Sequence, residues 1–137
     1  MKTVLAVVSS WEIANHLYTS LEDTSFSCLC TTWQKAASFL PAQPDVLILE
    51  LCLPGCTGLD FLADNRDRLP PVVLALSTFT SRNVMEEAAA AGVTGMLRIP
   101  FPRREILRRL EEACKKIPPF REGKDCQKVT PYETRFT

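Results

Sequence analysis

The stretch PDVLILELCLPGCTGLDFL, residues 44–62, joins an almost unbroken apolar run to a Pro-Gly turn and then to a segment with helical spacing. The run over 45–51 predicts a strand buried on both faces, and residues 58–69 predict a helix. One carboxylate, Glu50, stands near the end of the apolar run. Because an unpaired charge in a buried strand is costly, Glu50 needs either polar neighbours or a functional reason.

The same order of a strand followed by a helix recurs along the chain. Apolar runs predict strands at 3–8, 26–31, 45–51, 71–77 and 95–99, and helical spacing predicts helices at 9–22, 31–40, 58–69, 82–92 and 102–117. Ser9 with Glu12, and Thr31 with Gln34, fit capping boxes at the starts of the first two helices. Strands that alternate with helices pair in parallel through right-handed crossovers. We therefore predict an α/β fold, a doubly wound five-stranded parallel sheet with helices on both faces.

The pattern stops after residue 117. Residues 118–137 contain three prolines, mixed charges and scattered apolar side chains. This composition is typical of a linker or a terminal tail, and the segment is too short for an output domain. We predict one domain over 1–117 and a C-terminal tail or linker over 118–137.

Composition excludes several classes of protein. The 137 residues carry 16 Lys plus Arg and 16 Asp plus Glu, and a net charge of zero disfavours bulk electrostatic binding to nucleic acid. No apolar run approaches the about 18 residues of a membrane span or the about 7–15 of a signal-peptide core, so we expect a cytoplasmic protein. The chain has six cysteines without a Cys-x2-Cys pair, and a single His. We therefore expect the cysteines to be small buried hydrophobes, and we expect no zinc site.

Two segments, together with the order of elements, resemble the receiver domains of bacterial response regulators. Residues 44–62 are similar to the strand, turn and helix that carry the family's phosphoacceptor Asp, and AGVTGMLRIPF (91–101) is similar to the segment that ends in Lys, a cis Pro and an aromatic residue. The resemblance covers 1–117 and implies the flavodoxin-like strand order 2-1-3-4-5. In this family a histidine kinase donates a phosphoryl group to the Asp, with Mg²⁺ bound by oxygen ligands.

The positions that carry this chemistry differ here. The motifs put Glu50 at the phosphoacceptor position and Ile99 at the Lys position, before Pro100 in a bond implied to be cis. The other matched positions are Val8, Ser9 and Ser10 for the acidic pair, Ser77 for the switch hydroxyl, Met96 for the aromatic switch, and the Cys52 backbone for the metal-binding carbonyl. We expect no catalytic residue, no cofactor, weak or absent Mg²⁺ binding and no phosphotransfer.

Two interpretations of Glu50 remain open. Its longer anionic arm could imitate a phosphorylated Asp by accepting a hydrogen bond from Ser77, which would hold the domain near one signalling conformation. Alternatively, it is a partly solvated carboxylate satisfied by neighbouring hydroxyls and N–H groups. Arg82 and Arg98 are candidate charge partners.

Charged residues of the last two helices and the last strand form a candidate interaction surface, which comprises Glu86, Glu87, Arg98, Arg103, Arg104 and Arg108. The simpler interpretation is a solvated surface with local pairs such as Arg108–Glu112. In the family this face is the usual dimer or partner surface. The resemblance therefore implies protein partners and a possible homodimer, with no nucleic acid or membrane bound by this domain.

These observations predict a receiver-like signalling domain of a two-component or phosphorelay regulator that is not phosphorylated at Glu50 and acts through protein–protein interaction. One alternative is a conventional receiver phosphorylated at a non-standard site. Another is a flavin- or small-ligand-binding domain of the same fold. The loop after the first strand has no Gly to build a phosphate cradle, which disfavours that last alternative.

Overall fold

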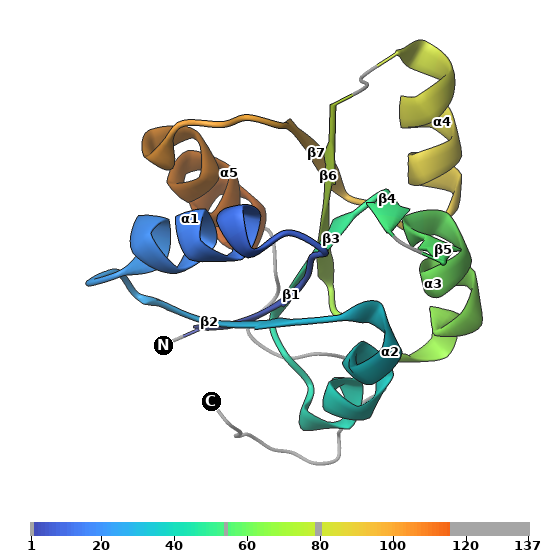
Figure 1. The fold of residues 1–137 in the computed structure, drawn as a ribbon, viewed down its shortest axis with the longest axis horizontal. Coiled ribbons are helices and arrows are strands. Elements are labelled where there is room, and N and C mark those ends of the chain that lie inside the picture. Colours follow the sequence, from blue (N-terminus) through green and yellow to red (C-terminus); the bar gives the residue numbers. More distant parts are fainter. Residues whose placement is uncertain (1, 54, 79–80, 116–137) are drawn as a thin grey trace.

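Five parallel strands form the sheet at the centre of a computed structural model, which describes residues 2–53, 55–78 and 81–115 (Figure 1). The strands run in the order β2-β1-β3-β6-β7. Their bounds are β1 (Lys2–Val7), β2 (Phe26–Thr31), β3 (Val46–Glu50), β6 (Val72–Ser77) and β7 (Gly95–Arg98). This is the predicted doubly wound α/β sheet, with the predicted order 2-1-3-4-5. The predicted boundary at 117 and the tail 118–137 lie outside the described residues.

Helices cover both faces of the sheet (Figure 1). One face carries α1 (Trp11–Leu21) and α5 (Arg103–Lys115), and the other carries α2 (Trp33–Ala36), α3 (Gly58–Asp64) and α4 (Arg82–Ala90). Two 3-10 turns, η1 (Ala37–Ala42) and η2 (Arg66–Arg68), follow α2 and α3. Among the described residues, no helix is long and apolar enough to cross a membrane.

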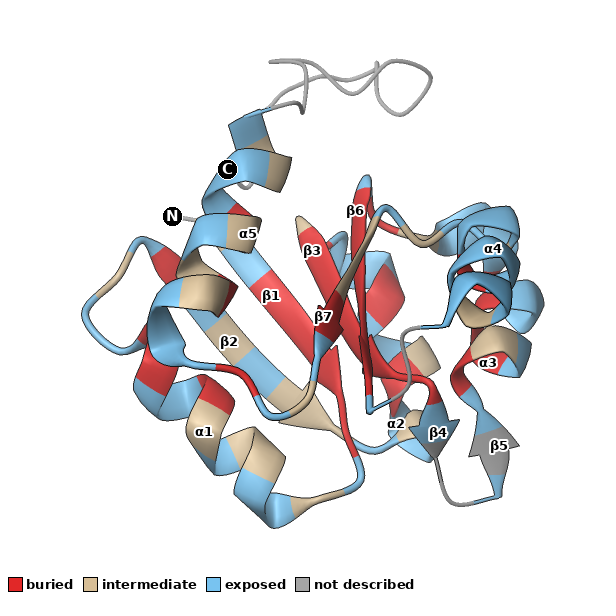
Figure 2. Cartoon of the chain, turned by 90° about the horizontal axis from the view of Figure 1, so that it is seen from above, coloured by how far each residue is buried: buried red, intermediate tan, exposed pale blue. Residues whose placement is uncertain are grey.

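Strand β3 lies between β1 and β6, and every one of its residues is buried (Figure 2). Successive side chains alternate between the two helical layers. Val46 and Ile48 pack towards α1 and α5, whereas Leu47 and Leu49 pack towards α2 and α3. Each fully buried aliphatic side chain contributes about 1.5–3 kcal/mol. The alternation places Glu50 on the α1 side of the sheet.

The second predicted helix differs most from the structure. Residues 31–40 do not form one helix, because Thr31 ends β2 and α2 spans only four residues before η1. Pro41 lies inside η1, and a proline has no N–H for a regular α-helical ladder. The N-cap is Thr32, whose side chain makes no capping hydrogen bond, so the predicted Thr31–Gln34 box is wrong. Helix α3 likewise ends at Asp64 and not at 69.

A short antiparallel pair that the sequence did not predict precedes α3. Strands β4 (Cys52–Leu53) and β5 (Cys56–Thr57) flank Gly55, whose φ of +80° belongs to the left-handed region. Thr57 then caps α3, because its hydroxyl accepts a hydrogen bond from the Asp60 N–H at 3.1 Å. This pair leads the chain directly from Glu50 into α3.

Candidate functional site

The carboxyl ends of the parallel strands meet at one edge of the sheet, where sites occur in folds of this class. Glu50 is the last residue of β3 and Ser77 the last residue of β6. Both side chains are buried, at 8% and 7% exposure. In the interpretation that Glu50 is a carboxylate satisfied by neighbouring hydroxyls and N–H groups, the partial solvation is wrong, because the side chain is buried.

Ser9 satisfies the Glu50 carboxylate. The backbone N–H and the hydroxyl of Ser9 both donate to Oε1 of Glu50, and the two side-chain oxygens lie 3.1 Å apart. The candidate charge partners lie elsewhere: Arg82 pairs with Glu86 at 3.7 Å, and Arg98 lines a hollow beside α4. A buried carboxylate held by two donors avoids most of the cost of unpaired burial.

Ser9 is available for Glu50 because it does not cap α1. The N-cap is Ser10, whose hydroxyl accepts from the N–H groups of Glu12 at 3.1 Å and Ile13 at 3.4 Å. The predicted capping box of Ser9 and Glu12 is therefore wrong by one residue. That shift leaves the Ser9 N–H and hydroxyl facing β3.

The residues around Glu50 do not fit the Mg²⁺ ion that the fold family implies. Such an ion needs several oxygen acceptors directed at it. Here Val8 is buried and apolar, and Ser9 directs hydrogen-bond donors at the carboxylate. Across the part of the chain that the structure describes, no group of three or more His, Cys, Asp or Glu could hold a metal ion. Cys52 is exposed.

Ile99, which was predicted at the Lys position, is apolar, and the loop that follows it contacts α1. Ile99 packs half-buried against the core, and the Ile99–Pro100 peptide bond is cis. The carbonyl oxygen of Phe101, two residues after Ile99, lies 2.7 Å from Nε2 of His16, and the centroids of the His16 and Phe101 rings are 4.8 Å apart. Because a carbonyl only accepts, Nε2 carries the proton. Sequence reasoning missed His16, since this contact joins positions 85 residues apart.

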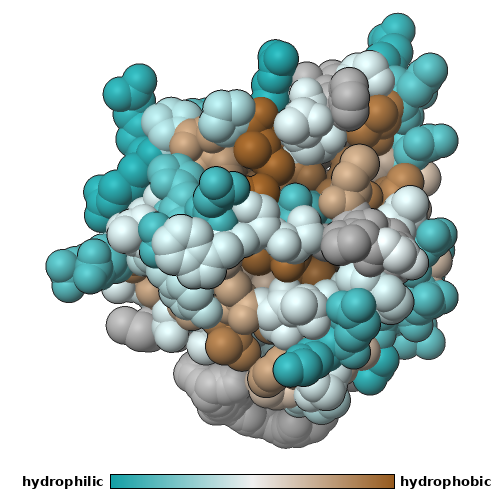
Figure 3. Space-filling model, viewed as in Figure 1, coloured by the Kyte–Doolittle hydropathy of each residue, from teal (hydrophilic) through white to brown (hydrophobic). Residues whose placement is uncertain are grey.

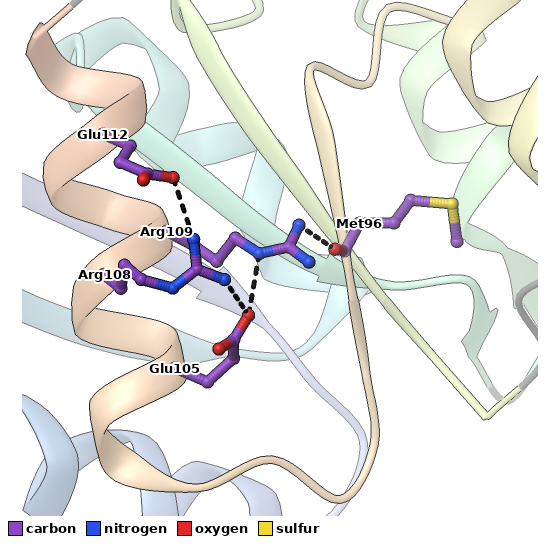
Figure 4. Close-up of polar contacts among 5 residues, drawn as sticks. All are labelled: Met96, Glu105, Arg108, Arg109 and Glu112. Carbon is purple, nitrogen blue, oxygen red and sulfur yellow. Dashed lines mark hydrogen bonds and ion pairs between the residues drawn. The ribbon is translucent and has the colours of Figure 1, made fainter.

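A second region lies on the face formed by α4, β7 and α5. It contains an open hollow of about 580 Å³ lined chiefly by Met85, Ala89, Val93, Met96, Arg98 and Arg109. The side chain of Met96 points away from α5, while its carbonyl accepts a hydrogen bond from Nη1 of Arg109 at 2.6 Å (Figure 4). Sequence reasoning did not include Arg109 in the site.

The predicted interaction residues belong to α4, β7 and α5 and are exposed: Glu86, Glu87, Arg98, Arg103, Arg104 and Arg108. Arg108 makes the predicted pair with Glu112 at 3.2 Å and a second with Glu105 at 2.6 Å (Figure 4). Hydrogen bonds from Arg109 and Arg108 lower the pKa of Glu105. On the face shown in Figure 3, apolar side chains appear in patches between hydrophilic ones.

The chain is similar in sequence and in fold to known proteins. No protein-family model matches the chain. The structure of chemotaxis protein CheY4 of Vibrio cholerae superposes with a TM-score of 0.75 at 30% identity, covering 82% of this chain and 98% of that one. Transcriptional regulatory protein DesR of Bacillus subtilis is 35% identical over 77 residues, which are 56% of this chain and 38% of that protein.

Transcriptional regulatory protein KdpE of Mycobacterium tuberculosis is 37% identical over 73 residues, which are 53% of this chain and 32% of that protein. The chain thus spans 38% and 32% of the lengths of these two curated relatives.

Proposed function

Because this chain belongs to the receiver domains of two-component response regulators, a signalling family, we propose that it is a signalling domain that has lost phosphotransfer at Glu50 and acts by binding protein partners. The observation that carries the proposal is the pair of Ser9 donors on the Glu50 carboxylate. We assign this role to residues 1–117, with 118–137 as a tail or linker.

Three features of the Glu50 site oppose phosphoryl transfer. One of the two carboxylate oxygens of Glu50, Oε1, already accepts two hydrogen bonds from Ser9. A glutamate also reaches one bond further than an aspartate, and about 1 Å of misplacement can cost 10²-fold in rate. Finally, Ile99 supplies no cation for the transferred charge.

The same contacts favour a structural role for Glu50 over imitation of a phosphoryl group. Imitation required a hydrogen bond from Ser77, whereas within the described residues both hydrogen bonds to the carboxylate come from Ser9. These bonds join the end of β3 to the loop between β1 and α1. Glu50 therefore fills the phosphoacceptor position as a fixed link between two strand ends.

The direct test exposes the protein to Mg²⁺ with beryllofluoride or with a small phosphodonor. Trp11 is 78% exposed and stands two positions after Ser9, so its fluorescence in a Trp33→Phe variant reports on this edge. We expect no Mg²⁺-dependent change and no gain of the about 80 Da that one phosphoryl group adds. A receiver with the usual Asp serves as the positive control.

A mass gain would contradict the proposal, and peptide mapping would then locate it. An adduct at Glu50 would restore the conventional mechanism. An adduct at another carboxylate would favour a receiver that uses a non-standard site. A purified protein that carries flavin would replace both receiver interpretations.

The partner surface of this proposal is the hollow between α4, β7 and α5. Its floor is apolar, with Met85, Val93 and Met96, and its charged lining residues are Arg98 and Arg109. Among the residues that the structure describes, no carboxylate lines the hollow. A partner segment that presents an apolar side chain beside a carboxylate complements both properties.

A titration with model peptides tests this chemistry. A helical peptide with a leucine next to a glutamate should shift the NMR amide signals of Val93 and Met96, whereas the same peptide with lysine should not. Arg98→Glu should weaken binding about tenfold by reversing a rim charge. The matched control is Arg66→Glu, an exposed position on η2.

Equal binding of the two peptides would contradict the proposed partner chemistry. Sedimentation of the protein alone tests the possible homodimer. A concentration-dependent dimer that Arg98→Glu weakens and Arg66→Glu leaves unchanged would identify a second copy of the chain as the partner.

A further inference from the structure

Two cysteines stand side by side on β2, away from both regions described above. Cys28 and Cys30 are separated by one residue, so their side chains project from the same face of the strand. Their Sγ atoms lie 3.9 Å apart. Both are half-buried and pack against the core beneath α1. Sequence reasoning treated them as small hydrophobes, which does not account for the pairing of their sulfur atoms.

The surroundings make the two thiols unequal. The pKa of Cys30 is lowered, chiefly by a hydrogen bond from the Cys28 thiol, whereas the same contact and burial raise the pKa of Cys28. The backbone N–H of Cys30 donates to the Tyr18 hydroxyl at 2.9 Å, which holds this part of β2 against α1. Cys30 is thus the thiol that ionises first, and Cys28 is its proton-holding neighbour.

We propose that Cys28 and Cys30 form a redox-active pair that hydrogen peroxide converts into a disulfide within β2. The Cys30 thiolate attacks one peroxide oxygen, the O–O bond breaks, hydroxide leaves, and Cys30 becomes a sulfenic acid. The sulfur of Cys28 then attacks that of Cys30, so that the S–S bond forms as the S–O bond breaks. The Cys28 proton leaves with the oxygen as water. Two thiols lose two electrons, and one peroxide becomes two waters.

The backbone permits this bond because β2 is the edge strand of the sheet. Two residues of a strand rise about 6.6 Å, which lies within the about 4.4–6.8 Å range of Cα separations in disulfides. Shortening the sulfur distance requires β2 to bulge at Leu29. Among the described strands, β2 pairs with β1 alone, and Leu29 is 45% exposed, so the strand can bend on its open side.

Oxidation would therefore change the pairing of β2 with β1 and its contact with α1, in addition to the two sulfur atoms. Leu29 stands opposite Leu5 in the β1–β2 ladder, and Cys30 stands opposite Ala6. A bulge at Leu29 disturbs this register and the contact between Cys30 and Tyr18 of α1. We expect faster amide exchange in β2 and around Tyr18 after oxidation.

Trypsin makes the test specific. Cleavage after Lys2 and after Lys35 releases peptide 3–35, which contains these two cysteines and no other. After treatment of the intact protein with peroxide, we expect this peptide to lose about 2 Da, to resist alkylation, and to recover both properties with dithiothreitol. The Cys114→Ser variant, which removes a half-buried cysteine of α5, should behave like the parent.

Replacing each cysteine singly separates the role of Cys30, which peroxide oxidises first, from that of Cys28, whose sulfur then attacks Cys30. In Cys28→Ser the mass loss should disappear and dimedone, which labels sulfenic acid, should mark Cys30. In Cys30→Ser both signals should disappear, and circular dichroism verifies that each variant is folded. An unchanged mass of peptide 3–35 in the peroxide-treated parent would overturn the proposal. A disulfide that joins either cysteine to Cys52 or Cys114 would also overturn it.

Discussion

The edge of the sheet at Glu50 and the face of α4, β7 and α5 differ in the exposure and hydrogen bonding of their charged side chains. At Glu50 one carboxylate is 8% exposed and accepts hydrogen bonds from both donors of Ser9. On the other face Glu105, Arg108, Arg109 and Glu112 form an open network beside a hollow. The Glu50 carboxylate is buried and hydrogen-bonded within the fold, whereas the charged side chains of the second region are partly exposed.

This contrast indicates where the domain can act. Phosphotransfer needs an accessible carboxylate with acceptors for a cation around it. Glu50 is buried, and Ser9 directs hydrogen-bond donors at it. Docking needs exposed apolar area with a complementary charge, and the region of α4, β7 and α5 has both. The two regions should therefore respond differently to substitution.

Gly58→Ala should have the largest effect. A Cβ at Gly58 would lie 2.5 Å from the Glu50 carbonyl oxygen and 2.9 Å from the Leu51 Cα, and neither backbone atom can move aside alone. We expect a loss of about 3 kcal/mol in the free energy of unfolding, measured by urea denaturation. The matched control is Gly95→Ala, whose Cβ would meet the movable end of Leu74 at 2.9 Å. Equal losses would show that the two regions are equally tightly packed.

Glu50→Ala should come next. It leaves the Ser9 N–H and hydroxyl without their acceptor, at a cost of about 1–3 kcal/mol in unfolding free energy. Ser9→Ala removes only one of the two donors and should cost less. The control is Asp64→Ala, which removes an exposed carboxylate of α3 and should change stability by less than about 0.5 kcal/mol. If Ser9→Ala lowered the free energy of unfolding more than Glu50→Ala, linking the two strand ends would not be the role of Glu50.

Glu105→Gln should have a smaller, pH-dependent effect. Arg109 and Arg108 lower the pKa of Glu105 in the folded protein below its ordinary 4.5. A carboxyl group whose pKa is lowered by folding stabilises the folded state at pH values above its ordinary pKa. This stabilisation is lost as the pH falls through the lowered pKa. The parent should therefore exceed Glu105→Gln in stability at neutral pH, and the difference should disappear once the pH falls below the lowered pKa of Glu105. A difference that stayed constant with pH would contradict this assignment.

Arg108→Ala should have the smallest effect. Its partners are Glu105 and Glu112, and its side chain is 53% exposed. Exposed ion pairs of this kind contribute about 0–1 kcal/mol and weaken with salt. Thermal unfolding at low and high salt should show a shift that disappears at high salt. Arg103→Ala, at an exposed position of the same helix, controls for the change in net charge.

The strands were the most predictable part of the molecule. The apolar runs of β1, β3 and β6 have the length and continuity of strands covered on both faces, and burial alone requires that pattern. The helix over 31–40 was wrong because capping residues and apolar spacing are local signals. Pro41 and the packing of Leu40 against the sheet instead favour a short helix and a 3-10 turn.

The candidate site was predictable as a set of positions but not as a set of contacts. The motifs place Glu50 at the end of β3, and the apolar pattern alone indicated a special role for its charge. Whether Ser9 or Ser10 caps α1 depends on the angle between β1 and the start of that helix. That one-residue difference decides which serine donates to Glu50 across 41 residues.

The sequence by itself therefore determined the class of fold, because the type and period of the residues along the chain predict its strands and helices. Its resemblance to the receiver family implied the order of the sheet and the residues at the acidic and Lys positions. Only the tertiary structure decided that Ser9 satisfies Glu50, that Arg109 binds the Met96 carbonyl, and that the Cys28 and Cys30 sulfur atoms lie 3.9 Å apart. The first two join residues of different elements, and the third depends on side-chain orientation within one strand. Such contacts exist only when packing sets the distance and direction of each side chain.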